Sequence, residues 1–96
     1  ASAELEPDEL AAWEQEWVRL SGQAQFPERL PTALDDVDGW RMELQRERGN
    51  ITERWLLVVA KRGGRLYTLR GACMDALFSE TLPEFEKVLT EFKFLP

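Results

Sequence analysis

The chain has 96 residues, of which 44% are apolar and 10% aromatic, and its formal net charge at pH 7 is −6. This length suits a single domain spanning residues 1–96, and the apolar content is ample for a core without disulfide bonds. The acidic balance argues against nucleic acid as the main partner, because phosphate binding needs clustered lysine and arginine. No apolar run approaches the roughly 18–20 residues that a membrane-spanning helix needs.

Residues 7–21 are predicted to form the first helix. Pro7 suits a first helical turn and Gly22 a helix end. The apolar positions recur at helical spacing and are Leu10, Trp13, Trp17 and Leu20. Residues 23–38 follow, with two prolines and the acidic segment DDVDG, and this composition predicts an extended connector.

Three antiparallel strands are predicted next, over residues 40–46, 51–61 and 65–73. Apolar and polar residues alternate in the first, which indicates a half-buried strand. The second contains an unbroken apolar run over residues 55–60, which indicates burial on both faces. Gly63-Gly64 separates the second strand from the third and predicts a tight hairpin.

The last helix is predicted over residues 82–92. Thr81 opens it, because its spacing from Glu84 is that of a capping box, and Pro83 is tolerated in a first turn. Its apolar stripe is Leu82, Phe85, Val88, Leu89 and Phe92. The order of elements predicts an α+β fold, in which an antiparallel three-stranded sheet is flanked by two helices as a partial α/β/α sandwich.

Charge is spread unevenly along the chain. Residues 1–40 carry a net charge of −8, residues 41–72 carry +5 and residues 73–96 carry −3. A basic middle segment therefore lies between two acidic ones. The simplest interpretation is that these segments neutralise one another in the fold.

A two-residue turn at Gly63-Gly64 would sort the hairpin side chains onto two faces. One face then holds Leu56, Val58, Ala60, Tyr67, Leu69, Gly71 and Cys73. The other holds Trp55, Leu57, Val59, Lys61, Leu66, Thr68, Arg70 and Ala72. The face with Trp55 must be covered by the first helix, by a second chain or by a partner. The basic tip at Arg62 and Arg65 is interpreted as a solvated turn, and a finger that grips a partner is the alternative.

The residue types needed for common catalytic chemistry are missing. The sequence contains no histidine, which removes the commonest general base and metal ligand. The single cysteine, Cys73, is interpreted as a small core residue. A calcium loop aligned on Gly39 fails, because Leu34 and Gln45 would take its first and last ligand positions. We therefore expect no enzyme, no catalytic residue, no metal site and no cofactor.

The segment VVAKRGGRLYTLRGAC, followed by LPEFEKVLTEFKF, resembles the carboxy-terminal half of the PsbP-like superfamily, which includes the Mog-type Ran-binding proteins. The resemblance covers about residues 40–95. The positions that match the hairpin return are Gly64, Leu66, Tyr67 and Leu69. Phe85 and Leu89 match the helix, and residues 92–94 match the terminal motif, with Glu91 in place of its serine.

The resemblance implies an α/β/α sandwich around an antiparallel sheet and non-enzymatic binding of protein partners. Family members usually have further strands before the first helix, and this chain begins without them. The resemblance thus implies either a trimmed domain or a sheet completed by a second chain. It implies no catalytic residue, and among its branches are bacterial lipoproteins and secretion chaperones. The compartment stays open between the cytoplasm and, for a chain whose signal or lipoprotein segment was removed, the periplasm.

The first functional hypothesis is a protein-interaction module of an assembly or chaperone type. It would bind a protein partner or a second copy of the chain through an apolar sheet face with an arginine rim. The residues assigned to this face and rim are Trp55, Leu57, Leu66, Thr68, Arg70, Arg62 and Arg65. The alternative is a small-ligand or lipid carrier with a pocket between helix and sheet, where Tyr67, Thr68 and Arg70 would supply the polar groups.

Overall fold

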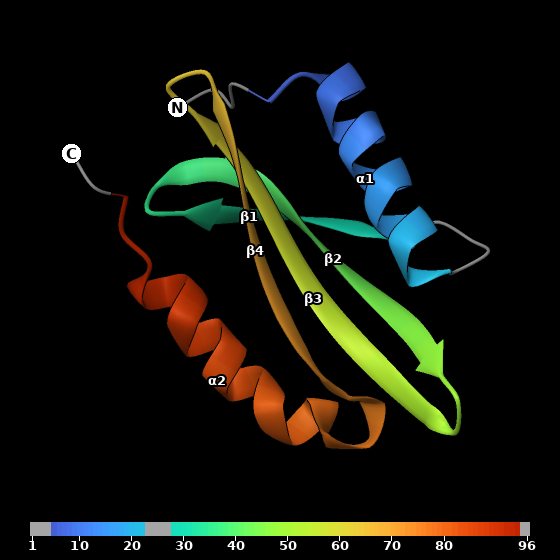
Figure 1. Ribbon diagram of the computed structural model, residues 1–96. Coiled ribbons are helices and arrows are strands. Elements are labelled where there is room, and N and C mark those ends of the chain that lie inside the picture. Colours follow the sequence, from blue (N-terminus) through green and yellow to red (C-terminus); the bar gives the residue numbers. More distant parts are fainter. Residues whose placement is uncertain (1–4, 23–27, 95–96) are drawn as a thin grey trace.

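The computed structural model describes residues 5–22 and 28–94 and folds them into one antiparallel sheet with two helices (Figure 1). The elements in chain order are α1 (Pro7–Ser21), β1 (Arg29–Leu34), β2 (Val37–Arg48), β3 (Ile51–Arg62), β4 (Arg65–Met74), the 3-10 turn η1 (Asp75–Leu77) and α2 (Phe78–Glu91). The four strands pair in the order β1-β2-β3-β4. The α+β class and the predicted first helix are confirmed, and the sheet has one strand more than predicted.

Two-residue turns connect all four strands. Gly63 and Gly64 both have positive φ, as a type I′ hairpin requires, and Arg62 pairs with Arg65 across the turn as predicted. Asp35 and Asp36 also have positive φ, at 47° and 66°. Because aspartate tolerates the left-handed region better than most residues, this acidic pair can turn the chain.

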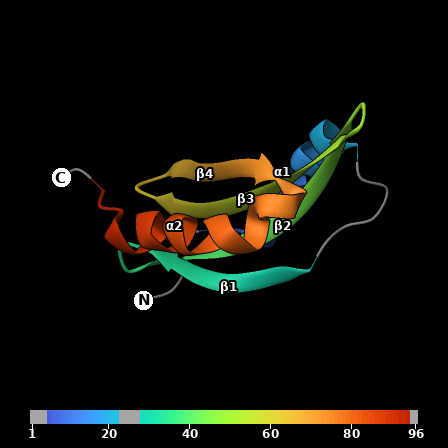
Figure 2. The same ribbon diagram turned by 90° about the horizontal axis from the view of Figure 1, so that it is seen from below.

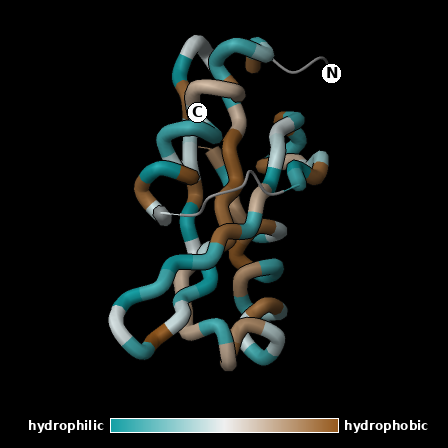
Figure 3. The backbone as a smooth tube through the Cα atoms, turned by 90° about the vertical axis from the view of Figure 1, so that its right-hand side faces the viewer, coloured by the Kyte–Doolittle hydropathy of each residue, from teal (hydrophilic) through white to brown (hydrophobic). Residues whose placement is uncertain are grey.

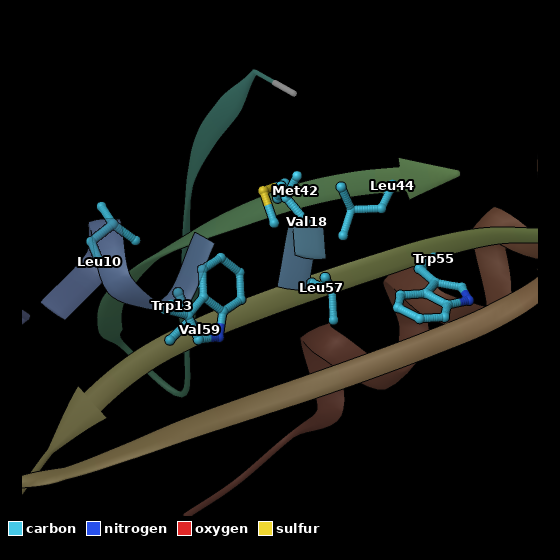
Figure 4. Close-up of a cluster of buried hydrophobic side chains, with 8 residues drawn as sticks. All are labelled: Leu10, Trp13, Val18, Met42, Leu44, Trp55, Leu57 and Val59. Carbon is cyan, nitrogen blue, oxygen red and sulfur yellow. The ribbon is translucent and has the colours of Figure 1, made fainter. Parts of the chain in front are cut away.

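The two helices lie on opposite faces of the sheet (Figures 1 and 2). The odd-numbered β3 residues Trp55, Leu57 and Val59 face α1, where they pack with Leu10 and Trp13 (Figure 4). The even-numbered Val58 and Ala60 face the other way, where they pack with Leu34 and partly buried residues of α2 and the chain after it. Hydrophobic residues accordingly follow the middle of the molecule (Figure 3). The prediction that this run is buried on both faces is confirmed.

The predicted connector over residues 23–38 is wrong for most of the residues that the structure describes. Residues 29–34 form β1, which pairs with β2 from Arg29 opposite Met42 to Leu34 opposite Val37. Pro31 obscured the strand signal, yet a proline is tolerated here because β1 is an edge strand with a free side. Residues 23–27 lie outside the described residues.

The predicted start of the last helix is also wrong. The helix α2 begins at Phe78, so neither Thr81 nor Glu84 caps it, and Pro83 lies inside it. A proline at this point leaves the carbonyl of Ser79 without its helical donor. Pro83 is exposed, so water can reach that carbonyl. The capping box instead occurs on α1, where Glu6 is the N-cap and Glu9 the reciprocal residue.

Candidate interaction surface

The sheet face assigned to a partner is largely covered by α1. Trp55 is 3% exposed and Leu57 is fully buried, so the expectation that they are open to a partner is wrong. The stripe of α1 is wider than predicted, because its tryptophans reach across the sheet. Trp13 is buried, and its indole Nε1 donates a hydrogen bond of 3.0 Å to Thr68 Oγ1 on β4. The first helix is therefore the cover of this face.

Trp55 lies between two arginines, at the end of the sheet face that α1 covers. The guanidinium carbons of Arg46 on β2 and Arg70 on β4 lie 5.5 and 5.2 Å from the centroid of its ring. Trp17 contacts the same ring edge-on, with 6.0 Å between centroids. The Nε1 of Trp55 is buried and has no hydrogen-bond partner among the described residues. We call Arg46, Trp55 and Arg70 the arginine–tryptophan row.

The outer edge of β4 is the longest open strand edge of the described sheet. β4 pairs with β3 along residues 65–74, and no described strand pairs with its other side (Figure 2). In a two-residue hairpin the closing pair, here Arg62 and Arg65, exchanges backbone hydrogen bonds. Counting from that pair, alternate residues direct their N–H and C=O groups outward, namely Leu66, Thr68, Arg70 and Ala72. The opposite edge strand, β1, is shorter and contains Pro31.

An apolar groove of about 250 Å³ runs between β4 and α2. Its lining consists of Leu56, Val58, Leu69, Arg70, Gly71, Phe85, Val88 and Leu89. The ring of Phe85 rests directly on Gly71, where an added Cβ would lie 2.7 Å from a ring carbon. Val88 is 60% exposed. The sequence predicted that Phe85 and Val88 belong to the buried stripe of this helix. In the structure they line the groove instead, because α2 covers the sheet loosely.

The remaining predicted partner residues are divided between the two sides of β4. Leu66, Thr68 and Arg70 lie on the α1 side, and Leu66 is 43% exposed. Arg62 and Arg65 lie at the hairpin tip on the α2 side, where the guanidinium of Arg62 lies 4.9 Å from the ring centroid of Phe94. The seven residues therefore do not form one continuous face.

Ion pairs between segments neutralise much of the charge of the sheet. Lys61 Nζ lies 2.8 Å from Glu9 of α1, and this ammonium, helped by the backbone N–H of Glu6, lowers the pKa of Glu9. On the other face, Arg41 pairs with Glu86 of α2 at 2.7 Å. Two further pairs join Arg29 to Glu14 and Arg54 to Asp75. Within the described part of the chain, the sheet arginines without an acidic partner are Arg46, Arg65 and Arg70.

Comparison with known proteins yields no relatives for this chain. No family model, no curated protein and no solved structure matches it. The similarity to PsbP-like proteins therefore remains a prediction. Across residues 5–22 and 28–94, no group of three or more histidine, cysteine or acidic residues is arranged to hold a metal ion. Neither described helix is long and apolar enough to cross a membrane.

Proposed function

We propose that this protein is a non-enzymatic interaction module that binds an extended segment of a protein partner along the outer edge of β4. One observation carries the proposal: a ten-residue edge strand without proline lies beside an apolar groove. Natural sheets usually protect such an edge by shortening it, bulging it or covering it. The same edge–groove combination is used by domains that recognise a peptide as an added strand.

Strand addition would satisfy both parts of the surface at once. Backbone groups of the partner would pair with Leu66, Thr68, Arg70 and Ala72, whose N–H and C=O groups face outward. Side chains of an added strand alternate between faces, so every second one would enter the groove beside Gly71 and Val88. The backbone supplies affinity in this mode and the groove supplies selectivity. The resemblance to PsbP-like proteins implies the same broad role.

A heterologous partner fits this edge better than a second copy of the chain. β4 contains Arg65 and Arg70 and no acidic residue. Antiparallel pairing of two β4 strands would therefore place the cations of both copies along one seam that has no acidic residue to pair with them. A second copy of the chain would nevertheless use the same edge. Sedimentation over a range of protein concentrations therefore measures whether the protein self-associates.

The test blocks the edge without disturbing the sheet. Because the N–H of Ala72 points outward, Ala72→Pro removes a donor from the free edge and none from the β3–β4 ladder. Ala72→Ser is the matched control, since it keeps that N–H. The probe is a short peptide of alternating Val and Thr with Ser-Gly flanks. Its binding is measured by the chemical shifts of the backbone amides in the isotope-labelled protein.

In the native protein and in Ala72→Ser, we expect the peptide to shift the amide resonances of Leu66, Thr68 and Arg70. In Ala72→Pro, we expect the peptide not to bind. Equal binding to both variants, or shifts confined to other strands, would contradict strand addition. Circular dichroism of each variant establishes that the fold is retained.

A carrier of small apolar ligands is the second candidate function. The side chains that line the groove between β4 and α2 are apolar, because the guanidinium of Arg70 lies on the other face of the sheet beside Trp55. Its volume of about 250 Å³ lies just below the usual range for ligand pockets. Saturable binding of a medium-chain fatty acid that is lost in Val88→Asp and unaffected by Ala72→Pro would favour this function over strand addition.

A further inference from the structure

We propose that the partner segment alternates acidic and apolar residues, with its acidic side chains directed to the arginine–tryptophan row and its apolar ones to the groove. This inference rests on the proposed function and specifies the chemistry of the partner. It follows from the charges that the fold leaves unpaired and from the side of β4 on which each of them lies.

Only some arginines of the sheet remain available to a partner. The acids of α1, η1 and α2 neutralise Lys61, Arg29, Arg54 and Arg41 through the ion pairs described above. Of the three sheet arginines without an acidic partner within the described residues, Arg65 lies at the hairpin tip outside the groove lining, and Arg46 and Arg70 contact the ring of Trp55. A guanidinium stacked on an indole still presents its N–H edge, so each arginine can receive a carboxylate in bidentate form.

A strand added to the outer edge of β4 would place some of its side chains on the α1 side of the sheet. Arg70 is one of the outward-facing β4 residues, and its side chain lies on the α1 side of the sheet. The partner residue directly opposite Arg70 would have its side chain on that same side, at a Cα separation of about 5.5 Å. An acidic side chain there meets the guanidinium of Arg70, while Arg46, two strands further into the sheet, adds its positive charge at longer range.

The remaining side chains of the same added strand would lie on the α2 side of the sheet. Partner residues before and after the one opposite Arg70 would direct their side chains to the α2 side. There they meet Leu69, Gly71 and Val88, which line the groove. The ring of Phe85 fills the space over Gly71, so an apolar partner residue opposite Gly71 would pack against that ring. Acidic and apolar positions of the partner therefore alternate.

The overall charge of the protein makes this inference sharply testable. A net charge of −6 would favour a basic peptide if long-range electrostatics decided binding. The arginine–tryptophan row favours an acidic one. Local and global electrostatics therefore predict opposite orders of affinity.

The experiment compares three peptides of equal length and equal flanks, in which Val alternates with Glu, Thr or Lys. We expect the Glu peptide to bind about three- to tenfold more tightly than the Thr peptide, as one or two partly shielded charge pairs provide. The Lys peptide should bind more weakly than either. Raising the salt concentration to about 0.5 M should remove most of the difference between the Glu and Thr peptides.

Arg70→Gln and Arg46→Gln identify the residues responsible. Arg70→Gln should remove most of the preference for the Glu peptide and Arg46→Gln a smaller part of it, while each leaves the affinity for the Thr peptide within about twofold. The matched control is Lys87→Gln, an exposed cation of α2 outside the row, which should keep the full preference. Trp fluorescence of each variant shows whether the packing around Trp55 is retained.

The possible failures are distinguishable. If the Thr peptide binds along β4 but the Glu peptide binds no better, or if the preference survives in both arginine variants, the acidic-partner inference is wrong and strand addition stands. If no peptide binds at the amides of β4, the proposed function fails and the inference fails with it.

Discussion

A single turn residue ties the segment that follows α2 to the sheet. Asp35, in the turn between β1 and β2, accepts a hydrogen bond of 3.0 Å from the backbone N–H of Phe94 and one of 3.2 Å from Lys93 Nζ. Asp35 has positive φ, and its carboxylate contacts Phe94, 59 positions later in the chain. One acidic turn residue thus anchors the segment that follows α2, where Phe94 packs against Tyr67.

At the residue scale, we predict that the anchoring by Asp35 depends on pH. The N–H of Phe94 and then the ammonium of Lys93 lower the pKa of Asp35 below its ordinary value of 3.8. Stability from a lowered carboxyl pKa is complete above the ordinary value and is lost as the pH falls through the folded-state value. Asp35→Asn, which also tolerates positive φ, should therefore lower the melting temperature at pH 7, and this effect should shrink progressively as the pH falls below 3.8 and through the folded-state pKa. An effect of the substitution that stays constant over this acidic range would show that the charge of Asp35 is unimportant.

At the scale of elements, α1 is the component that converts an open sheet face into a core. Its buried residues are Leu10, Trp13, Val18 and Ser21. They cover β2 and β3, and one hydrogen bond reaches further, from Trp13 to Thr68 on β4. That bond connects the first helix to the strand whose edge we propose as the binding site. The position of α1 and the order of β4 are therefore expected to be coupled.

A double-mutant cycle tests this coupling. Trp13→Phe removes the donor, Thr68→Val removes the acceptor, and each should cost about 0.5–1.5 kcal/mol beyond its packing effect. The double variant should cost less than the sum of the two single ones, because the second change breaks a bond that is already lost. Chemical denaturation of the four proteins gives the coupling energy. Strictly additive costs would mean that the hydrogen bond does not join the two elements in solution.

At the scale of the whole molecule, the two sides of the sheet are unequally sealed. The α1 side holds a cluster of eight buried residues, whereas the cluster on the α2 side holds three. Among the described residues of α2, Phe78 alone is buried. The second helix therefore covers its face loosely, and the groove beside β4 is a direct result of this.

We predict that native-state hydrogen exchange reflects this asymmetry. The amides of β2 and β3 should exchange most slowly, those of α1 faster, and those of α2 fastest among the regular elements, because regions with little buried apolar contact open at lower free-energy cost. Equal protection of α1 and α2 would mean that the α2 side is better packed in solution than the structure indicates. Phe78→Leu, which changes the one buried residue of α2, should accelerate exchange in α2 more than in α1.

Local patterns in the sequence were sufficient where neighbouring residues decide the outcome. The bounds of α1, the Gly63-Gly64 hairpin and its register all depend on helical periodicity, proline and glycine positions, and turn chemistry. The two-sided burial of residues 55–60 was predictable for a similar reason, because an unbroken apolar run has no side that water could occupy. The start of α2 and the strand β1 were not predictable in this way. Pro83 is tolerated inside α2 because it is exposed, and Pro31 is tolerated in β1 because β1 is an edge strand.

The sequence by itself therefore determined the fold class, the central hairpin and the uneven distribution of charge. Only the tertiary structure decided which surfaces remain available. Alternation assigned Trp55 and Leu57 to one face, but α1 covers that face because tryptophan side chains span more of it than their spacing reveals. Likewise, charge counts could not tell which arginines stay unpaired, because that depends on which acids of α1, η1 and α2 come within reach. Packing across the sheet is a long-range property, and it places the candidate site at the edge of β4.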